Sequence, residues 1–210
     1  MLSARRIALK MNGFLKSYGP SKVKRILWDK EYSTDKWNFA YDTVGDGLYS
    51  HLERHAANGS ILDLGCGMGN TANEVAASAY QTYVGVDISE TCLQKATMRS
   101  EKNGRADRNR FALGDLLSYV PEQQFNVILF RESMYHVPLG KIKSMLDRYS
   151  GYLLDGGVFM VRMNTTDGVV GKTKSRPTAM VGVIESDFNV LEKRQYGGEA
   201  GPTVIVFRPR

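Results

Sequence analysis

Three glycines alternate with other residues in the stretch DLGCGMG, residues 63–69, directly after a short apolar run. Glycine loses more backbone freedom on folding than any other residue, so such a cluster needs a reason. A bare turn lets a ligand approach the backbone, and the N–H groups that open a following helix bind negative groups. A plain strand-to-helix turn would need one glycine. We therefore predict that residues 63–69, with the acid Asp63, bind a ligand.

Two further acids stand at matching places in the next two apolar runs. Asp87 ends the run TYVGVD, and Asp115 follows RFALG. A carboxylate about twenty residues beyond a glycine turn can accept both hydroxyls of a ribose. An adenine amino group can donate to Asp115, while the N–H of Leu116 serves a ring nitrogen. Three acids at one edge of a sheet predict a ligand that contains a nucleoside.

The elements that must position these acids follow from the hydrophobic pattern. From residue 59 onward, short apolar runs alternate with stretches of helix length at 70–79, 89–102 and 139–153. This alternation predicts a parallel sheet with helices on both faces. The last two runs, FNVLEKRQY and TVIVFRP, have a connection too short for a crossover helix and should form an antiparallel hairpin. We predict a Rossmann-like, doubly wound α/β fold whose seven-stranded sheet is mostly parallel.

The residues before this sheet are expected to form a helical cap or lid. We divide the chain into a cap segment, 1–57, and a ligand-binding domain, 58–210. A first helix should end at Gly19-Pro20, ahead of a second basic segment. A third helix is expected over 40–56, with one face formed by Tyr41, Val44, Leu48 and Leu52.

The positive charge is concentrated in this cap. The chain carries a net charge of +6, yet residues 1–30 alone hold eight Lys or Arg against one acid. The remaining body is nearly neutral, which does not favour a nucleic-acid partner. For the first helix we favour a surface helix packed on the domain. A helix that contacts a membrane surface or covers the substrate is the sharper alternative, and an organelle transit peptide is a third.

Composition sets further limits. A chain of 210 residues, 42% hydrophobic, suits one domain with a modest appendage, and no apolar run reaches the roughly 20 residues that span a bilayer. The two cysteines, Cys66 and Cys92, cannot form a disulfide framework, so we expect a cytoplasmic protein. His51 and His55 lack the glutamate and further ligands of a zinc motif. We expect no metal, and a solvated helix face for these histidines.

The order of these motifs over residues 58–163 resembles the class I S-adenosylmethionine-dependent methyltransferases. The run from Asp63 through Gly65 and Gly67 to Gly69 matches the first motif of that family. FNVILFRESMYHV resembles its fourth-strand motif, and LLDGGVFMV its fifth-strand entry, with Asp155 in place of the usual proline. The resemblance implies S-adenosylmethionine as cofactor, S-adenosylhomocysteine as product, and no metal.

The resemblance also implies site residues. Asp63 would lie at the amino end of the cofactor, Arg131 beside its methionine part, Asp87 at its ribose and Asp115 at its adenine. Tyr32 and Trp37 would close over it from the aromatic segment 28–39, whereas we assign Trp28 to core packing. The predicted cofactor-binding set is Asp63, Gly65, Cys66, Gly67, Gly69, Asp87, Ile88, Gly114, Asp115, Leu116, Arg131, Trp37 and Tyr32.

The predicted acceptor site follows the fourth strand. By resemblance Glu132, Tyr135 and His136 face the acceptor, and we predict His136 as a general base; a structural histidine that holds the loop is the alternative. The loop 164–178 adds Lys172, Lys174 and Arg176. We expect a small-molecule acceptor methylated on a hydroxyl, such as a natural product or sugar. A small amine, a nucleic acid or a protein stays an alternative, and the oligomeric state is open.

Two other classes remain as competitors. A nicotinamide-dependent oxidoreductase would carry G-x-G-x-x-G, but counting from Gly65 the third glycine position holds Asn70. Asp63 would also repel the pyrophosphate of that cofactor. A non-catalytic methyltransferase-like protein is the second competitor, and cofactor binding would separate it from an enzyme.

Overall fold

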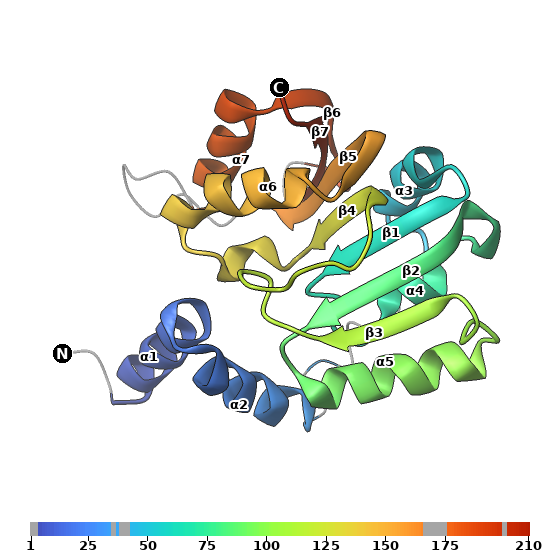
Figure 1. Ribbon diagram of the computed structural model, residues 1–210. Helices are drawn as coiled ribbons and strands as arrows, with labels where there is room; N and C mark the ends of the chain where they lie inside the picture. Colours follow the sequence, from blue (N-terminus) through green and yellow to red (C-terminus); the bar gives the residue numbers. More distant parts are fainter. Residues whose placement is uncertain (1–3, 35–36, 38–42, 166–175, 199–200) are drawn as a thin grey trace.

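A computed structural model describes residues 4–34, 37, 43–165, 176–198 and 201–210. Seven strands form a sheet in the order β3-β2-β1-β4-β5-β7-β6 (Figure 1). β1 to β5 run parallel and β6 and β7 form an antiparallel hairpin, both as predicted. β7 is also antiparallel to β5. The strands are β1 (Gly59–Leu64), β2 (Tyr80–Asp87), β3 (Asn109–Leu113), β4 (Phe125–Arg131), β5 (Leu153–Asn164), β6 (Asn189–Gln195) and β7 (Pro202–Arg208).

Helices cover both faces of this sheet, which confirms the doubly wound fold (Figure 1). The α-helices are α1 (Ala4–Tyr18), α2 (Ser21–Tyr32), α3 (Leu48–Ala56), α4 (Asn70–Glu74), α5 (Glu90–Lys102), α6 (Ile142–Ser150) and α7 (Arg176–Asp187). Short 3₁₀ helices are η2 (Ala77–Ala79), η3 (Met134–His136) and η4 (Leu139–Lys141). In the described part of the chain, no helix has the length and apolarity that a membrane span requires.

Successive side chains of β4 pack alternately into two hydrophobic cores, one on each face of the sheet. Ile128 and Phe130 pack with the apolar faces of α6 and α7, whereas Val127 and Leu129 pack with α3 on the opposite face. Successive side chains of a strand point to opposite faces, so a strand that is apolar throughout must be covered on both. The strand order reverses between β1 and β4, and in such sheets ligands bind at this switch point, beyond the carboxyl ends of the strands.

Two predicted helices are shorter than expected. α3 begins at Leu48 rather than near residue 40, because Gly45 takes a φ of +84° and Asp46 accepts a hydrogen bond from the Leu48 N–H at 3.0 Å. Val44 precedes the helix and is exposed, and Tyr41 lies outside the described residues. The helix predicted over 70–79 is instead α4 and η2, since Val75 between them is extended.

α1 and α2, called the cap here, lie beside the sheet, with α2 against α5 (Figure 1). Asp29 of α2 accepts hydrogen bonds from the Ser89 hydroxyl at 2.7 Å and the Thr91 N–H at 3.1 Å, where α5 begins. Lys95 of α5 donates to the carbonyl of Tyr32 at 2.6 Å. These bonds fix the cap beside the carboxyl ends of β2 and β3. The division of the chain at residue 57 stays a prediction.

Candidate functional site

The glycine turn between β1 and α4 requires glycine at all three positions. Gly65, Gly67 and Gly69 have φ values of +85°, +53° and +73°, in the left-handed region that disfavours other residues. A Cβ on Gly65 would lie 2.3 Å from the Cβ of Ser133, and one on Gly67 would lie 3.2 Å from the Tyr32 hydroxyl. Glycine is therefore required for two reasons. The backbone takes a left-handed conformation, and neighbouring side chains lie too close to leave room for a Cβ.

Asp87, at the end of β2, is held by backbone donors. Its two carboxylate oxygens accept hydrogen bonds from the N–H groups of Gly67 and Ser89, both at 3.0 Å. Burial raises the pKa of Asp87 above its usual value, and these donors act in the opposite direction. A carboxylate offers about four acceptor positions, so two donors leave capacity for the hydroxyls of a ligand.

A cavity of about 630 Å³ opens beside this turn, at the carboxyl ends of the strands. The predicted cofactor residues that line it are Tyr32, Trp37, Gly65, Cys66, Gly67, Asp87, Ile88, Gly114, Asp115, Leu116 and Arg131. The predicted acceptor residues Glu132, Tyr135 and His136 line it as well. Among the residues that the structure describes, no cluster of three or more His, Cys, Asp or Glu could hold a metal.

Asp63 and Gly69 are the predicted residues that do not line the cavity. Asp63 is buried beneath the turn and accepts a hydrogen bond from the Tyr83 hydroxyl at 2.5 Å, while its other oxygen has no partner in the described chain. Burial raises the pKa of Asp63 to about 6, although the Tyr83 bond and the charge of Arg131 oppose the shift. Asp63 is therefore bound to β2 through Tyr83 and does not face the cavity.

Asp115, at the end of β3, is bound by the cap. Lys24 of α2 forms an ion pair with it, and the Ser21 hydroxyl donates to the same oxygen at 2.8 Å. The N–H of Leu117 donates to the other oxygen at 3.0 Å. Burial would raise the pKa of Asp115, but the bonds from Lys24, Leu117 and Ser21 together lower it, so the acid is ionised. Sequence reasoning missed Lys24 because it stands among many bases.

Two arginines meet at the ends of β4 and β5. Arg131 and Arg162 are paired in register, and Asp46 accepts from both guanidinium groups at 3.0 Å. Arg162 also pairs with Glu132, a non-glycine residue whose φ is +52°. A residue held in this region costs about 1–3 kcal/mol, and such strain gathers at functional sites. Arg162 was missed, although a charge near the end of the buried run GVFMVRM signals it.

Aromatic rings close the cavity from the cap side. Trp28, Tyr32 and Trp37 lie with their ring centroids about 6 Å apart. The assignment of Trp28 to the core is wrong, because its ring lines the cavity. His136 meets the Trp28 ring edge-on at 4.8 Å. Burial, with the charges of Lys16 and Arg176, lowers the pKa of His136 to about 4.

Known proteins carry the same pattern. A family model described as a methyltransferase domain matches residues 61–157, a range that includes the glycine turn, Asp87 and Asp115. Residues 61–157 are thus similar to the methyltransferase domains of known proteins. This confirms the family that the sequence motifs indicated.

Similar methyltransferases share part of their length with this one. Sterol 24-C-methyltransferase ERG6B of Gibberella zeae is 27% identical over 131 residues, 59% of this chain and 34% of that protein. Methyltransferase GfsG of Streptomyces halstedii is 30% identical over 60% of this chain and 46% of its own. The 27-O-demethylrifamycin SV methyltransferase of Amycolatopsis mediterranei is 31% identical over 53% and 40%. The matched segment thus spans between a third and a half of these relatives.

Solved methyltransferase structures show the same fold over most of the chain. The N-methyltransferase NodS of Bradyrhizobium japonicum, in complex with S-adenosylhomocysteine, has a TM-score of 0.67 at 16% identity and covers 88% of this chain and 97% of its own. A methyltransferase of Geobacter sulfurreducens with the same ligand has a TM-score of 0.60 at 18% identity and covers 81% and 93%.

On the side of the cavity formed by Glu132, Tyr135 and His136, hydrogen bonds join η3 to β5 and α7. The Tyr135 hydroxyl accepts from the Asn164 N–H at 2.5 Å and donates to the Asn164 carbonyl at 3.0 Å. Arg176 donates to the carbonyl of Val137 at 2.8 Å. Lys172 and Lys174, named with Arg176 as candidate cations, lie outside the described residues. Tyr135 thus forms a fixed wall of the cavity.

The prediction of a solvated face for His51 and His55 is wrong. His51 is buried, with its ring nitrogens 2.7 Å from a Glu192 oxygen and 2.5 Å from the Tyr196 hydroxyl. The Nε2 of His55 lies 2.9 Å from the other Glu192 oxygen. These contacts join α3 to β6 and lie apart from the cavity. Their partners follow more than a hundred residues later, so local pattern could not show them.

Lys24→Met tests whether the ion pair to Asp115 holds the cap. Opening of the cap returns Asp115 to water, so the loss is that of one charged hydrogen bond, about 1.5 kcal/mol, and α2 should exchange its amide hydrogens roughly tenfold faster. Lys22→Met, an exposed change in the same helix, is the control. Equal exchange in the two variants would show that Lys24 does not hold the cap.

Proposed function

We propose that this protein binds S-adenosylmethionine in the cavity and transfers its methyl group to a hydroxyl of a small-molecule acceptor. The orientation of Asp87 is the observation that carries the proposal. Its carboxylate is fixed by Gly67 and Ser89 at the cavity wall, where ribose hydroxyls can donate to it. Gly65 and Gly67 leave the wall beside it without side chains.

The remaining wall residues fit the other parts of the cofactor. Asp115 and the Leu116 N–H stand at the end of β3, where an adenine can donate to the acid and accept from the backbone. Arg131 lines the opposite part of the wall, at the end of β4, and suits the carboxylate of the methionine moiety. These assignments rest on the residues that face the cavity.

Bound S-adenosylmethionine supplies a methyl group on a positively charged sulfur, which is also the leaving group. The chain's own residues then have to orient the acceptor and exclude water. Trp28 and Tyr32 of the cap, together with Trp37, cover one side of the cavity, and Tyr135 forms a fixed wall on the other side. Glu132 and His136 provide the polar groups that face an acceptor there.

His136 is proposed as the group that accepts the hydroxyl proton. With a pKa lowered to about 4 by burial, its imidazole stays neutral throughout the physiological range and can accept a hydrogen bond. A base this weak contributes less than one poised near neutral pH. We therefore expect a modest role, in which His136 orients the hydroxyl and takes its proton as the methyl carbon is transferred.

His136→Ala should slow the chemical step by roughly tenfold to a hundredfold, at or below the low end of general-base effects. Since the folded pKa is about 4, His136 is mostly neutral above pH 5, so the wild-type rate should show no histidine limb between pH 5 and 8. Single-turnover rates with labelled cofactor measure both effects. Wild-type rates in the variant, with unchanged cofactor affinity, would remove His136 from the chemistry.

An amine acceptor is the second candidate, and the low pKa of His136 favours it. A neutral amine is already nucleophilic and needs little help from a base. Incubation with methyl-labelled cofactor and matched hydroxyl and amine acceptors decides between them, with NMR assignment of the methylated atom. Cofactor binding without transfer to any acceptor would favour the non-catalytic alternative. The small-molecule partner and the cytoplasmic location stay predictions.

A further inference from the structure

The cap exposes large apolar side chains, of which Tyr18 lies with its ring 5.6 Å from the Arg176 guanidinium of α7. On α1, Met11, Phe14 and Tyr18 are 59%, 59% and 50% exposed, and the spacing of three and four residues puts them on one face. The rings of Phe14 and Tyr18 stack at 4.9 Å. On α2, Ile26 is 58% exposed. Exposed apolar side chains that lie together are characteristic of interaction surfaces.

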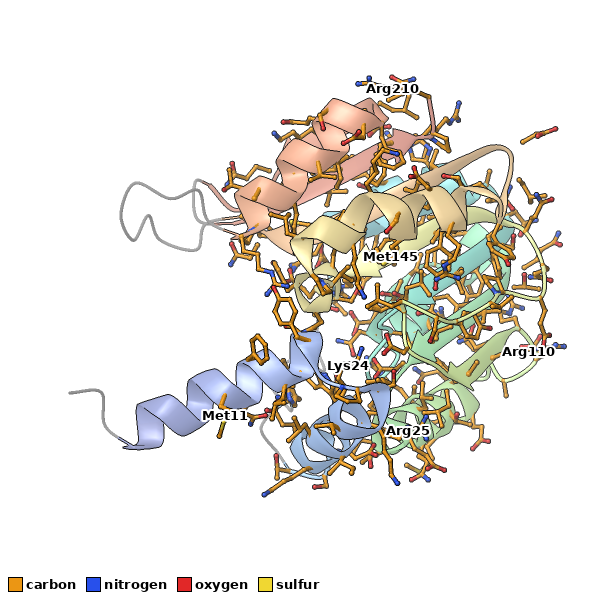
Figure 2. All side chains as sticks on the ribbon, turned by 60° about the vertical axis from the view of Figure 1, so that its left-hand side comes forward. Met11, Lys24, Arg25, Arg110, Met145 and Arg210 are labelled. Atoms are coloured by element: carbon orange, nitrogen blue, oxygen red, sulfur yellow. The ribbon has the colours of Figure 1, made fainter. Side chains whose placement is uncertain are left out.

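The charges around these side chains are all of one sign. Lys22, Arg25 and Lys30 of α2 are exposed and pair with no acid in the described chain. Both acids of α2 are directed inward, because Asp29 binds the start of α5 and Glu31 pairs with Lys16. Figure 2 shows Lys24 between α2 and the sheet, where it is buried, whereas Arg25 is exposed.

We propose that this outer cap face, formed by Met11, Phe14, Tyr18, Lys22, Arg25, Ile26 and Lys30, binds the surface of a membrane that contains anionic lipid. Apolar and aromatic side chains enter the boundary between headgroups and acyl chains, while lysine and arginine attract anionic headgroups. Lys16 and Lys24 of the same helices line the cavity. Docking by the cap would therefore bring the site to the lipid surface, beyond what the proposed methyl transfer requires.

Charge and polarity select this occupant over two others. A second copy of the chain on the same face would place three unpaired cations against three more. A nucleic acid would match the cations but leave Met11, Phe14 and Tyr18 without apolar contact, and the rest of the chain carries no net positive charge. A lipid surface offers apolar contact to Met11, Phe14 and Tyr18 and anionic headgroups to the exposed lysine and arginine side chains.

Vesicle flotation with the full chain tests the proposal without any activity measurement. The protein should bind vesicles of phosphatidylcholine mixed with phosphatidylglycerol and should bind phosphatidylcholine alone far more weakly. The double variant K22E/R25E should bind the mixed vesicles at least about 25-fold less, since each basic residue contributes roughly fivefold. Its control is K102E/R110E, the same charge change at exposed positions of α5 and β3, which should bind as wild type.

A second pair of variants tests the apolar part at constant charge. Phe14→Ser should weaken vesicle binding several-fold, whereas Met98→Ser, at a 60% exposed position of α5, should not. No binding to mixed vesicles, or equal losses in the cap and control variants, would overturn the proposal. Tighter binding to a DNA oligonucleotide than to vesicles, or a dimer in solution that Phe14→Ser dissociates, would overturn it in favour of those partners.

Discussion

Asp87→Ala is expected to lower the affinity for S-adenosylmethionine about tenfold to more than a hundredfold, the usual loss of about 1.5–3 kcal/mol for a charged hydrogen-bond acceptor. The side chain lines the cavity, and its orientation is already fixed by Gly67 and Ser89. No reorganisation is therefore needed when ribose hydroxyls donate to it. Isothermal calorimetry with S-adenosylmethionine and S-adenosylhomocysteine measures the change directly.

Stability measurements keep this result interpretable. The folded pKa of Asp87 is raised by burial, so the folded state holds its proton more tightly than the unfolded state. Above that pKa the ionised carboxylate opposes folding. The variant Asp87→Asn has no charge and keeps an acceptor oxygen, so it should remain folded at pH 7. Asp107→Ala, at an exposed acid, is the control. Unchanged affinity in Asp87→Ala, or tight binding of NADH, would contradict the cofactor assignment.

Gly65→Ala should lower the free energy of unfolding by about 2–5 kcal/mol. About 1–2 kcal/mol comes from forcing alanine to a φ of +85°, and about 1–3 kcal/mol from overpacking, because the new Cβ would lie 2.3 Å from that of Ser133. Relief of the clash must displace either the turn or Ser133, whose hydroxyl donates to the Leu64 carbonyl at 2.5 Å. Cofactor binding should therefore be lost together with stability.

Gly104→Ala separates the two contributions. Gly104 has a φ of +65°, but a Cβ there would meet nothing within 4 Å. This variant should cost only the conformational part, about 1–2 kcal/mol, and should bind cofactor normally. Urea unfolding of both variants gives the difference. If both variants lose the same free energy of unfolding, the turn relaxes around Ser133. Close packing would then not be the reason for glycine at residue 65.

The parts of the site that sequence could predict are those encoded locally. The three glycines, Asp87 and Asp115 each follow an apolar run, and the carboxyl ends of parallel strands meet at one edge. The same alternation of runs predicted the parallel sheet and its antiparallel hairpin. A periodic pattern and its breaks are sufficient for these features.

The parts that sequence could not predict depend on which distant partner a side chain meets. Lys24 pairs with an acid 91 positions later, and His51 with Glu192 at 141, yet a lysine among bases and a histidine on a helix look solvated in isolation. Trp28 was assigned to the core because an aromatic residue beside other aromatics does not reveal whether they enclose a cavity. α3 begins later and α4 ends earlier than predicted, because Gly45 and Val75 do not take the helical conformation.

The place of β7 in the sheet constrains how a nascent chain can complete this fold. β7 follows β6 in the sequence but lies between β5 and β6, so β6 leaves the ribosome before the strand that binds it. The short connection lets β6 and β7 close first as a local hairpin, which then adds to β5 as a unit. A chain arrested before Pro202 leaves the edge of β5, with Phe159 and Val161, unpaired. Such an intermediate would offer a chaperone an apolar strand edge until synthesis resumes.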